Sequence, residues 1–374
     1  MIPLLNFPKV QFGFGTIESL PEELSALGVS RPLFVTDQGL VKCGVFSLVR
    51  KVMPSGAKFG VFDETPENPT VEGVERGLRA YRAADCNGVV AVGGGSVIDT
   101  AKVVSVLAGH PGTLAHYHKH PEEITSATVS LVAIPTTAGT GSEASPGAGI
   151  HSHSTSRDNA GVRSRYVVPK VAICDPALTL TLPPDLTAAT GMDALSHCIE
   201  GFLSKSVNPV VDAIALDGVR RVIAHLERAF ANGNDREARW NMAMAALESG
   251  MSIHKGLGPA HALGITFGDR GFRHGILVTM SLPAVLRIME RHAAEKMDRL
   301  AEAMALNSRQ AIPDAIKALN ARLALPASLC EIGYPNADLD EMADYAFKSF
   351  FNFWNPPYHP TLAEYRAMIQ EILG

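Results

Sequence analysis

The chain has 374 residues, which is enough for two or three domains with buried cores. Its 33 Lys and Arg residues stand against 38 Asp and Glu residues, a formal net charge of −5. No basic run offers a footprint for nucleic acid, and no acidic block predicts a disordered tail. Apolar residues make up 46% and charged residues 19%, which excludes disordered and collagen-like chains.

The start of the chain, MIPLLNFPKVQFGFG, has no long apolar core and so does not predict a secretory signal. The most apolar stretches, such as residues 89–92, are too short to cross a bilayer. Five cysteines without a CxxC pair favour reduced thiols over a disulfide framework. We therefore expect a cytoplasmic protein that binds neither a membrane nor nucleic acid, and the chain length favours an enzyme.

In the first half of the chain, short apolar runs alternate with helical patterns. The predicted strands are residues 31–37, 56–62, 88–94 and 130–135, and the predicted helices are residues 71–84 and 96–108. Strands that alternate with helices of this length predict an α/β fold with a mainly parallel sheet covered on both faces.

From about residue 186 onwards, almost every periodic segment is helical. The predicted helices are residues 186–203, 209–231, 236–251, 276–292, 294–304, 308–323, 339–348 and 360–373. The Pro183–Pro184 pair interrupts the periodicity, and Asp185 is suited to cap the helix that follows. We expect an α/β domain over residues 1–184 and an all-helical domain over residues 185–374.

A strand, a glycine turn and a helix follow one another in VVAVGGGSVIDTAK, where Gly93, Gly94 and Gly95 precede Ser96. Free N–H groups at a helix start attract phosphate, and glycines let the backbone approach a pyrophosphate without Cβ clashes. This segment predicts a nucleotide site. A tight turn without a ligand is the alternative interpretation.

A second loop of small residues, TTAGTGSEASPG, follows the predicted strand that ends at Pro135. It formally matches G-x-G-x-x-A, but no acidic residue follows a second strand at the distance of about 20 residues that a dinucleotide fingerprint requires. Its hydroxyl side chains predict instead a wall that lines a ligand: Thr136, Thr137, Thr140 and Ser142.

Asp37 ends the first predicted strand, RPLFVTD. A carboxylate at this position is suited to accept hydrogen bonds from the hydroxyls of an adenosine ribose, and it repels a 2′-phosphate. Asp37 therefore favours NAD over NADP as the cofactor. A simple turn residue is the alternative interpretation.

The sharpest group of polar residues lies in the second half of the chain. Asp193 and His197 are four residues apart in TAATGMDALSHCIEGF, so on a helix both point to one face. His261 and His274 follow in GLGPAHALGITFGDRGFRHG. One carboxylate and three imidazoles form a mixed oxygen and nitrogen set that suits Fe²⁺ or Zn²⁺ with an open position for substrate. Histidines that are satisfied within an apolar core are the alternative.

A second group of histidines is a weaker candidate. His116, His118 and His120 alternate in LAHYHKHPEE, so on a strand they would share a face. Lys119 and two glutamates surround them, however, and this polar composition favours a solvated loop.

Taken together, these motifs resemble the iron-containing alcohol dehydrogenase family. The matching pieces run in family order from about residue 30 to residue 285: TDQGL, PENPT, GGGSVIDTAK, IPTTAGTGSE, KVAICDPALTLTLPP, TAATGMDALSHCIE, KGLGPAHAL and FRHG. The resemblance implies an N-terminal dinucleotide-binding α/β domain and a C-terminal all-helical domain, with metal and nicotinamide meeting in a cleft. It also implies a homodimer that transfers hydride reversibly between an alcohol and NAD.

Residue by residue, the resemblance makes Asp193, His197, His261 and His274 the ligands of iron or zinc. It assigns a second set of residues to the cofactor: Asp37 to the adenosine ribose, Gly94, Gly95 and Ser96 to the pyrophosphate, Asp99 and Lys102 to the glycine-loop motif, and Thr136, Thr137 and neighbouring loop residues to the nicotinamide and phosphates.

The sequence departs from the family pattern near the site. Ile265 stands where the family usually has a second histidine, four residues after His261, that is often assigned to proton relay. The stretch between the third and fourth ligands is one residue shorter than the common pattern, and Asn355, Pro356 and Pro357 replace a common Asn-Pro-Arg. We hypothesise that water or a ribose hydroxyl carries the proton instead.

The substrate class stays open at this point. Five arginines near the expected cleft are suited to bind a carboxylate- or phosphate-bearing aldehyde, although their number alone does not favour this role over the alternative: Arg157, Arg163, Arg165, Arg270 and Arg273. Surface solvation, or contact with the cofactor phosphates, is the alternative role for them. A polyol dehydrogenase, a maleylacetate reductase-like enzyme and a nucleotide-binding scaffold without catalysis are the alternative functions.

Overall fold

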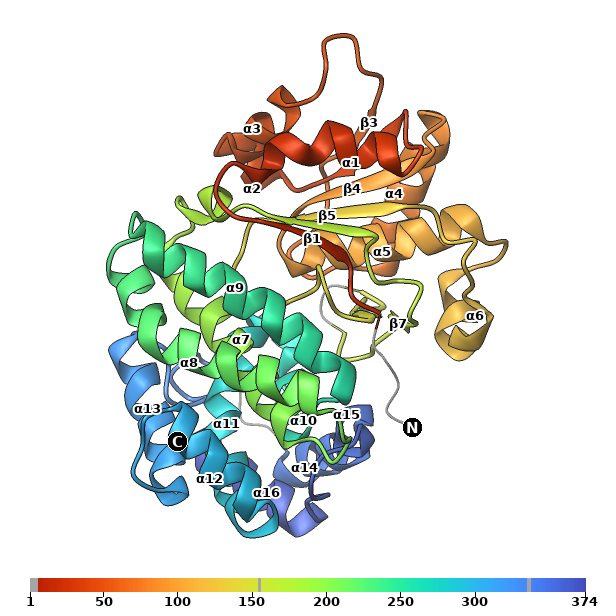
Figure 1. Ribbon diagram of the computed structural model, residues 1–374. Helices are drawn as coiled ribbons and strands as arrows, with labels where there is room; N and C mark the ends of the chain where they lie inside the picture. The colour runs from red at the N-terminus through yellow and green to blue at the C-terminus, as the bar shows by residue number, and fades with distance from the viewer. Residues whose placement is uncertain (1–5, 154–155, 335–337) are drawn as a thin grey trace. The chain divides into compact units, whose positions relative to one another are not determined.

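The computed structural model describes residues 6–153, 156–334 and 338–374. These residues form two compact units (Figure 1). Ala138–Thr140 and Leu182–Gly374 belong to a helical unit, and the described residues up to Thr137 belong with Gly141–Thr181 to an α/β unit. The polypeptide thus enters the helical unit briefly at residue 138 before it passes into that unit at residue 182.

Among the described residues, the α/β unit contains a six-stranded sheet in the order β1-β8-β5-β4-β2-β3. Its strands are β1 (Lys9–Phe12), β2 (Pro32–Val35), β3 (Gly60–Phe62), β4 (Gly88–Gly93), β5 (Leu131–Pro135) and β8 (Val171–Cys174). Every neighbouring pair in this sheet is parallel, so the predicted parallel α/β architecture is confirmed. A separate antiparallel pair is formed by β6 (Gly147–Ala148) and β7 (Val162–Arg163).

Alternate residues of each strand point to opposite faces of the sheet, and each face has its own apolar core. Val35 and Val89 belong to the core on one face, and Phe34 and Val90 belong to the core on the other. The helices that pack on the faces are α1 (Leu20–Ala26) and α3 (Val45–Lys51) on one side and α4 (Val71–Ala83) and α5 (Gly95–Gly109) on the other (Figure 1). The strands are apolar on both sides because helices cover both faces.

The second unit is helical, as the sequence predicts. Its helices are α7 (Pro184–Leu203), α8 (Pro209–Ala231), α9 (Arg236–Ser252), α10 (Pro259–Thr266), α11 (His274–His292), α12 (Ala294–Ala303), α13 (Ile312–Arg322), α14 (Leu339–Lys348), α15 (Phe350–Phe353) and α16 (Leu362–Leu373). No described helix is both long and apolar enough to span a membrane.

Helix α7 is buried along most of its length because its neighbours approach it closely. A Cβ atom at Gly201 would lie 2.7 Å from the carbonyl oxygen of Ser252, and one at Gly275 would lie 2.5 Å from that of Ala189. Only glycine allows backbones to pack at these distances. Polar side chains in the middle of α7, among them Asp193, His197 and Glu200, are therefore buried.

Two local predictions are wrong. Residues 114–119 form a short helix, α6 (Leu114–Lys119), where we expected a solvated loop, because Leu114 and Tyr117 are buried three residues apart and Thr113 caps the helix. Asp185 does not cap α7: the helix starts one residue earlier, at Pro184, so Asp185 lies in its first turn.

Candidate active site

Three strands of the parallel sheet end side by side, and the predicted nucleotide residues follow them. Val35 pairs with Ala91, so Asp37 comes after β2 at the level where Gly93 ends β4. Gly93 pairs in turn with Pro135 at the end of β5. This register brings Asp37, the glycine turn and the Thr136–Thr137 pair to one edge of the sheet. Ligands of open α/β sheets bind at this edge.

The glycine turn opens α5 without a side-chain cap. Gly94 is the N-cap residue and has no side chain that could bind the first N–H groups of the helix. A Cβ atom at Gly93 would lie 2.5 Å from Cβ of Val97, and one at Gly94 would lie 3.1 Å from Cγ2 of Thr137. The turn is therefore tight, and the N–H groups at the start of this 15-residue helix are suited to bind phosphate.

Two predicted cofactor residues already make hydrogen bonds within the protein. The Oδ1 atom of Asp37 accepts from the backbone N–H of Leu40 at 2.9 Å and so caps α2 (Gln38–Lys42). The hydroxyl of Ser96 donates to the carbonyl oxygen of Glu67. These bonds fix both side chains at the sheet edge.

Asp99 and Lys102 contact the loop that follows β5. Lys102 is fully buried, and its Nζ donates to Ser145 O at 3.1 Å, Ser145 Oγ at 3.0 Å and Gly147 O at 2.6 Å. Asp99 lies 3.7 Å from that Nζ. It accepts from Ser142 Oγ at 2.7 Å and from Gly149 N at 2.8 Å. All three donors of the lysine are occupied, so the pair ties residues 142–149 to α5.

Burial acts in opposite directions on the charges of this pair. It lowers the pKa of Lys102 and raises the pKa of Asp99, and the attraction between the two groups opposes both shifts.

The hydrogen bond from Ser142 to Asp99 links this predicted cofactor residue to α5. Thr140, which we also predicted as a loop residue near the cofactor, belongs to the helical unit.

Three of the four predicted metal ligands gather in the helical unit. Asp193 on α7, His261 on α10 and His274 at the start of α11 have ligand atoms that all lie within 4.8 Å of one another. Asp193 and His261 are buried, and His274 is exposed. A metal held by this set would thus have two ligands in the core and one at the solvent side.

The donor atoms of this group fit a cation. Among the described residues, Oδ1 of Asp193 and Nε2 of His261 are buried without a hydrogen-bond partner. Buried polar atoms in native proteins normally have partners, and an ion is one explanation for such orphans. Carboxylate oxygen and imidazole nitrogen are ligands that iron and zinc accept. The residues present therefore fit the metal that the family name implies.

His197 lies beside the group but outside the 4.8 Å set. Its ring stacks on that of His261 with the centroids 4.7 Å apart, and its Nε2 is 3.9 Å from Oδ1 of Asp193. Burial holds the pKa of His197 well below its ordinary value, so the ring is neutral. A neutral imidazole is the form that binds a metal.

Glu200 is a residue of this site that the sequence analysis did not single out. Its Oε2 lies 2.5 Å from Nδ1 of His261 and accepts from Gly258 N at 3.0 Å, and its Oε1 accepts from Ala260 N at 2.8 Å. The spacing of Asp193, His197 and Glu200, at intervals of four and three residues, was the available signal, because it marks one helical face.

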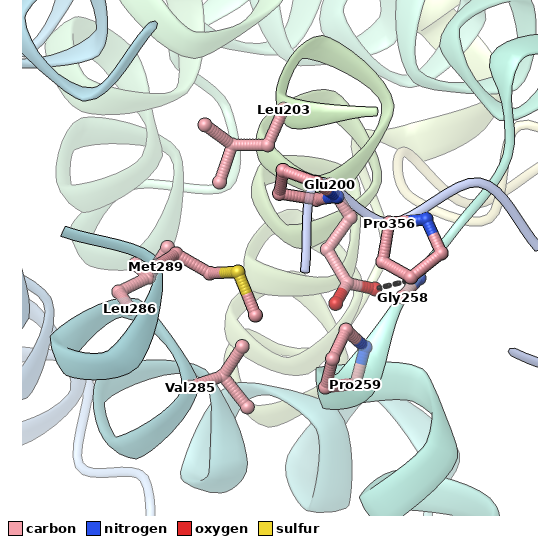
Figure 2. Close-up of a pocket in the computed structure, with 9 residues that line it drawn as sticks. Glu200, Leu203, Gly258, Pro259, Val285, Leu286, Met289 and Pro356 are labelled. Atoms are coloured by element: carbon pink, nitrogen blue, oxygen red, sulfur yellow. Dashed lines mark hydrogen bonds between the residues drawn. The ribbon is translucent and has the colours of Figure 1, made fainter. Parts of the chain in front are cut away.

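A small pocket adjoins Glu200 on the inside of the helical unit (Figure 2). Its other walls are apolar side chains and backbone: Leu203, Gly258, Pro259, Val285, Leu286, Met289, Pro356 and Pro357. Pro356 and Pro357 thus line the same pocket as the glutamate, and Pro357 is the residue that departs from the family's Asn-Pro-Arg pattern. Because few polar groups line this pocket, we interpret it as packing around Glu200 and not as the place where substrate binds.

Arg273 and Arg165, both proposed above for substrate binding, contact residues of their own unit. Arg273 donates to Asp185 at 2.6 Å, and the guanidinium of Arg165 lies over the ring of Tyr166 at 4.7 Å. Arg163 is partly desolvated, which lowers its pKa. Ile265 is half-buried on α10, one helical turn after His261.

The α/β unit also contains a carboxyl whose pKa burial raises. Oε1 of Glu143 is buried without a partner among the described residues, and burial raises the pKa of Glu143 to about 7. The unfolded chain ionises this group near its ordinary value of 4.5. Between these two pH values the folded state retains a proton that unfolding releases, so the stability of the fold falls as pH rises.

We therefore expect Glu143→Gln to become progressively more stable than the wild type as the pH rises from 4.5 to 7. The difference accumulates to about 3 kcal/mol, because each pKa unit corresponds to about 1.4 kcal/mol. Denaturant unfolding at pH 5, 6, 7 and 8 measures it, with the exposed Glu75→Gln as the control. A constant difference between Glu143→Gln and wild type across this range would contradict the prediction.

Comparisons with known proteins agree with this geometry. Residues 8–176 match the model of the family described as iron-containing alcohol dehydrogenase, and residues 187–372 match the C-terminal model of the Fe-containing alcohol dehydrogenase family. A 4-hydroxybutyrate dehydrogenase from Cupriavidus necator is 40% identical over 375 residues, which cover 97% of this chain and 97% of the relative.

Solved structures give the same result. A 1,3-propanediol oxidoreductase has a TM-score of 0.92 at 32% identity, with 100% of both chains covered. A sulfoacetaldehyde reductase from Bifidobacterium kashiwanohense, in complex with NAD⁺, has a TM-score of 0.89 at 26% identity and covers 100% of this chain and 98% of its own. The chain therefore belongs to the iron-containing alcohol dehydrogenase family and is an oxidoreductase that acts on alcohols.

Proposed function

We propose that the chain is a metal- and NAD-dependent dehydrogenase that interconverts a short carboxylate-bearing alcohol and its aldehyde. The observation that carries this proposal is the group of Asp193, His261 and His274, whose ligand atoms lie within 4.8 Å of one another. The 40% identity to a 4-hydroxybutyrate dehydrogenase supports a carboxylate on the substrate. A polyol is the second candidate, supported by the likeness to a 1,3-propanediol oxidoreductase.

Asp193, His197, His261 and His274 would hold the metal, which we propose to be iron or zinc. A divalent cation in this set supplies Lewis-acid polarisation of the alcohol oxygen and so favours its loss of a proton. The burial of Asp193 and His261 keeps water away from two of the ligands. The exposed position of His274 leaves access from solvent for a substrate.

We assign the cofactor to the carboxyl edge of the sheet, with NAD preferred over NADP. The uncapped start of α5, at Gly94, Gly95 and Ser96, would bind the pyrophosphate. Asp37 would accept from the adenosine ribose, and its charge disfavours a 2′-phosphate. Thr136, Thr137 and Ser142 would line the neighbouring wall, and Thr140 would complete it. The contacts of Asp99 and Lys102 support a positioning role, since they hold the loop that contains Ser142.

We further propose that residues 1–184 serve the cofactor and residues 185–374 the metal and substrate, in a cytoplasmic homodimer.

The first prediction concerns the metal. His261→Ala should lose the bound metal and turnover together, because it removes a buried ligand atom. Elemental analysis and NADH formation measure the two effects, and His120→Ala, which alters only an exposed group, is the control. Full activity in metal-free His261→Ala would exclude the metal assignment and favour a chemistry like that of maleylacetate reductases.

The second prediction concerns the substrate. We expect kcat/KM with NAD to be at least about tenfold higher for 4-hydroxybutyrate than for 1-butanol, since the 40% identical relative is a 4-hydroxybutyrate dehydrogenase and a charged group that binds the carboxylate contributes about 1.5–3 kcal/mol. Initial rates of NADH formation measure this, with 1,3-propanediol and NADP as comparison arms. Equal kcat/KM values for 4-hydroxybutyrate and 1-butanol would contradict the proposal of an anionic substrate. A higher kcat/KM for 1,3-propanediol would favour the polyol as substrate.

The third prediction concerns the proton. Ile265 cannot carry a proton, so we propose that water or a ribose hydroxyl does. Ile265→His introduces a group that titrates near neutral pH one helical turn from His261, and it should add an ionisation to the pH–rate profile of kcat. An unchanged profile in a variant that binds metal normally would count against this proton path.

A further inference from the structure

We propose that Glu200 is a positioning residue that fixes the tautomer and the orientation of the His261 ring, so that Nε2 is the atom offered to the metal. This inference rests on the proposed metal site. Glu200 itself is not a ligand: its carboxylate contacts the opposite nitrogen of the ring.

The hydrogen bonds around Glu200 define the proton on His261. A carboxylate only accepts hydrogen bonds, so Nδ1 of His261, 2.5 Å away, must carry the proton. The other ring nitrogen, Nε2, then has a lone pair. Nε2 is also the atom that is buried without a hydrogen-bond partner among the described residues. A proton on Nδ1 thus explains both observations: Nδ1 donates to Glu200, and the unprotonated Nε2 is left for a metal.

Backbone amides hold the glutamate in place. Gly258 N and Ala260 N donate to it at 3.0 and 2.8 Å, and an amide can only donate. Together with His261, three N–H groups therefore converge on one carboxylate. Figure 2 shows the bond between Glu200 and Gly258. Both oxygens are used, so the side chain has one orientation.

The same bonds supply α10 with an N-terminal acceptor. Gly258, its N-cap, has no side chain, and Pro259, its first residue, has no N–H group, so the Ala260 N–H would lack a partner. Glu200 on α7 provides that partner, and a Cβ atom at Gly258 would lie 3.0 Å from Oε1 of Glu200. Glu200 thus links α7 to the first turn of α10, the turn that contains His261.

The surroundings make these bonds effective. Glu200 and His261 are 5% and 1% exposed. Leu203, Val285 and Met289 border the carboxylate on one side, and Pro356 lies beside Gly258 on the other (Figure 2). Apolar walls keep water from competing for the oxygens and strengthen the hydrogen bonds that remain.

Metal affinity tests the inference. Partners of this kind typically change metal affinity by about 10- to 100-fold when they are removed. We expect Glu200→Gln to weaken Zn²⁺ or Co²⁺ binding by about tenfold and Glu200→Ala by more, because glutamine keeps one acceptor oxygen and alanine keeps none. The metal-free protein is titrated against a chromogenic chelator, in a His120→Ala background that removes the exposed donor group of His120, Glu122 and Glu123.

Glu248→Gln is the matched control. Glu248 is a buried glutamate of the same unit, but its carboxylate lies 3.4 Å from Arg221 and contacts no expected ligand. We expect its metal affinity to stay within about twofold of the parent protein. Folded Glu200 variants that bind metal as tightly as this control would overturn the inference and leave Glu200 a purely structural role.

Nitrogen-15 NMR of histidine-labelled, metal-free wild type provides a second test that uses none of the Glu200 variants. We expect His261, assigned by comparison with His261→Ala, to carry its proton on Nδ1. A proton on Nε2 would overturn the inference. A wild-type chain that binds no Zn²⁺ or Co²⁺ tightly would instead count against the proposed function, while the tautomer measurement would still decide the role of Glu200.

Discussion

The burial of polar side chains on helix α7 is the constraint on which the site depends. This helix lies in the core of its unit, yet one of its faces carries Asp193, His197 and Glu200. Each buried polar atom needs a partner, since an unsatisfied one costs about 1–3 kcal/mol. Glu200 finds three N–H donors within the protein, whereas Asp193 and His197 each leave an atom without a partner among the described residues. The satisfied glutamate stabilises the helix, and the unsatisfied atoms of Asp193 and His197 mark where a cation would bind.

The sheet edge depends on register in a comparable way. The parallel pairing of β2, β4 and β5 sets Asp37, the glycine turn and the two threonines at one level. Polar side chains next to them form hydrogen bonds within the protein: Lys102, for example, donates to Ser145 and Gly147 in the loop after β5. Rigid elements thus support both sets of residues that a dehydrogenase needs, one in each unit.

Local patterns in the sequence were sufficient for most elements and for four ligand candidates. The strands β2, β4 and β5 and the long helices are apolar at the right period, so they could be predicted. β1 was missed because its sequence, KVQF, mixes polar and apolar residues and none of them is fully buried. Its partner β8 lies 162 residues further along the chain, and only the fold brings the two strands together. α10 was missed because it is short and its N-cap lacks a side chain. Glu200 was missed because its partners lie 58 to 61 residues away, and only the fold joins them.

The course of the chain between the units has a consequence for the loop that follows β5. Ala138–Thr140 belongs to the helical unit although Thr137 and Gly141 on either side belong to the α/β unit, and the chain changes unit again between residues 181 and 182. Among the described residues, the chain therefore crosses between the units three times. Two of these crossings lie inside the hydroxyl-rich loop, and one of them is at Gly141, whose φ of +63° only glycine adopts readily. A larger side chain at Gly141 would thus strain the backbone of a loop that belongs in part to each unit.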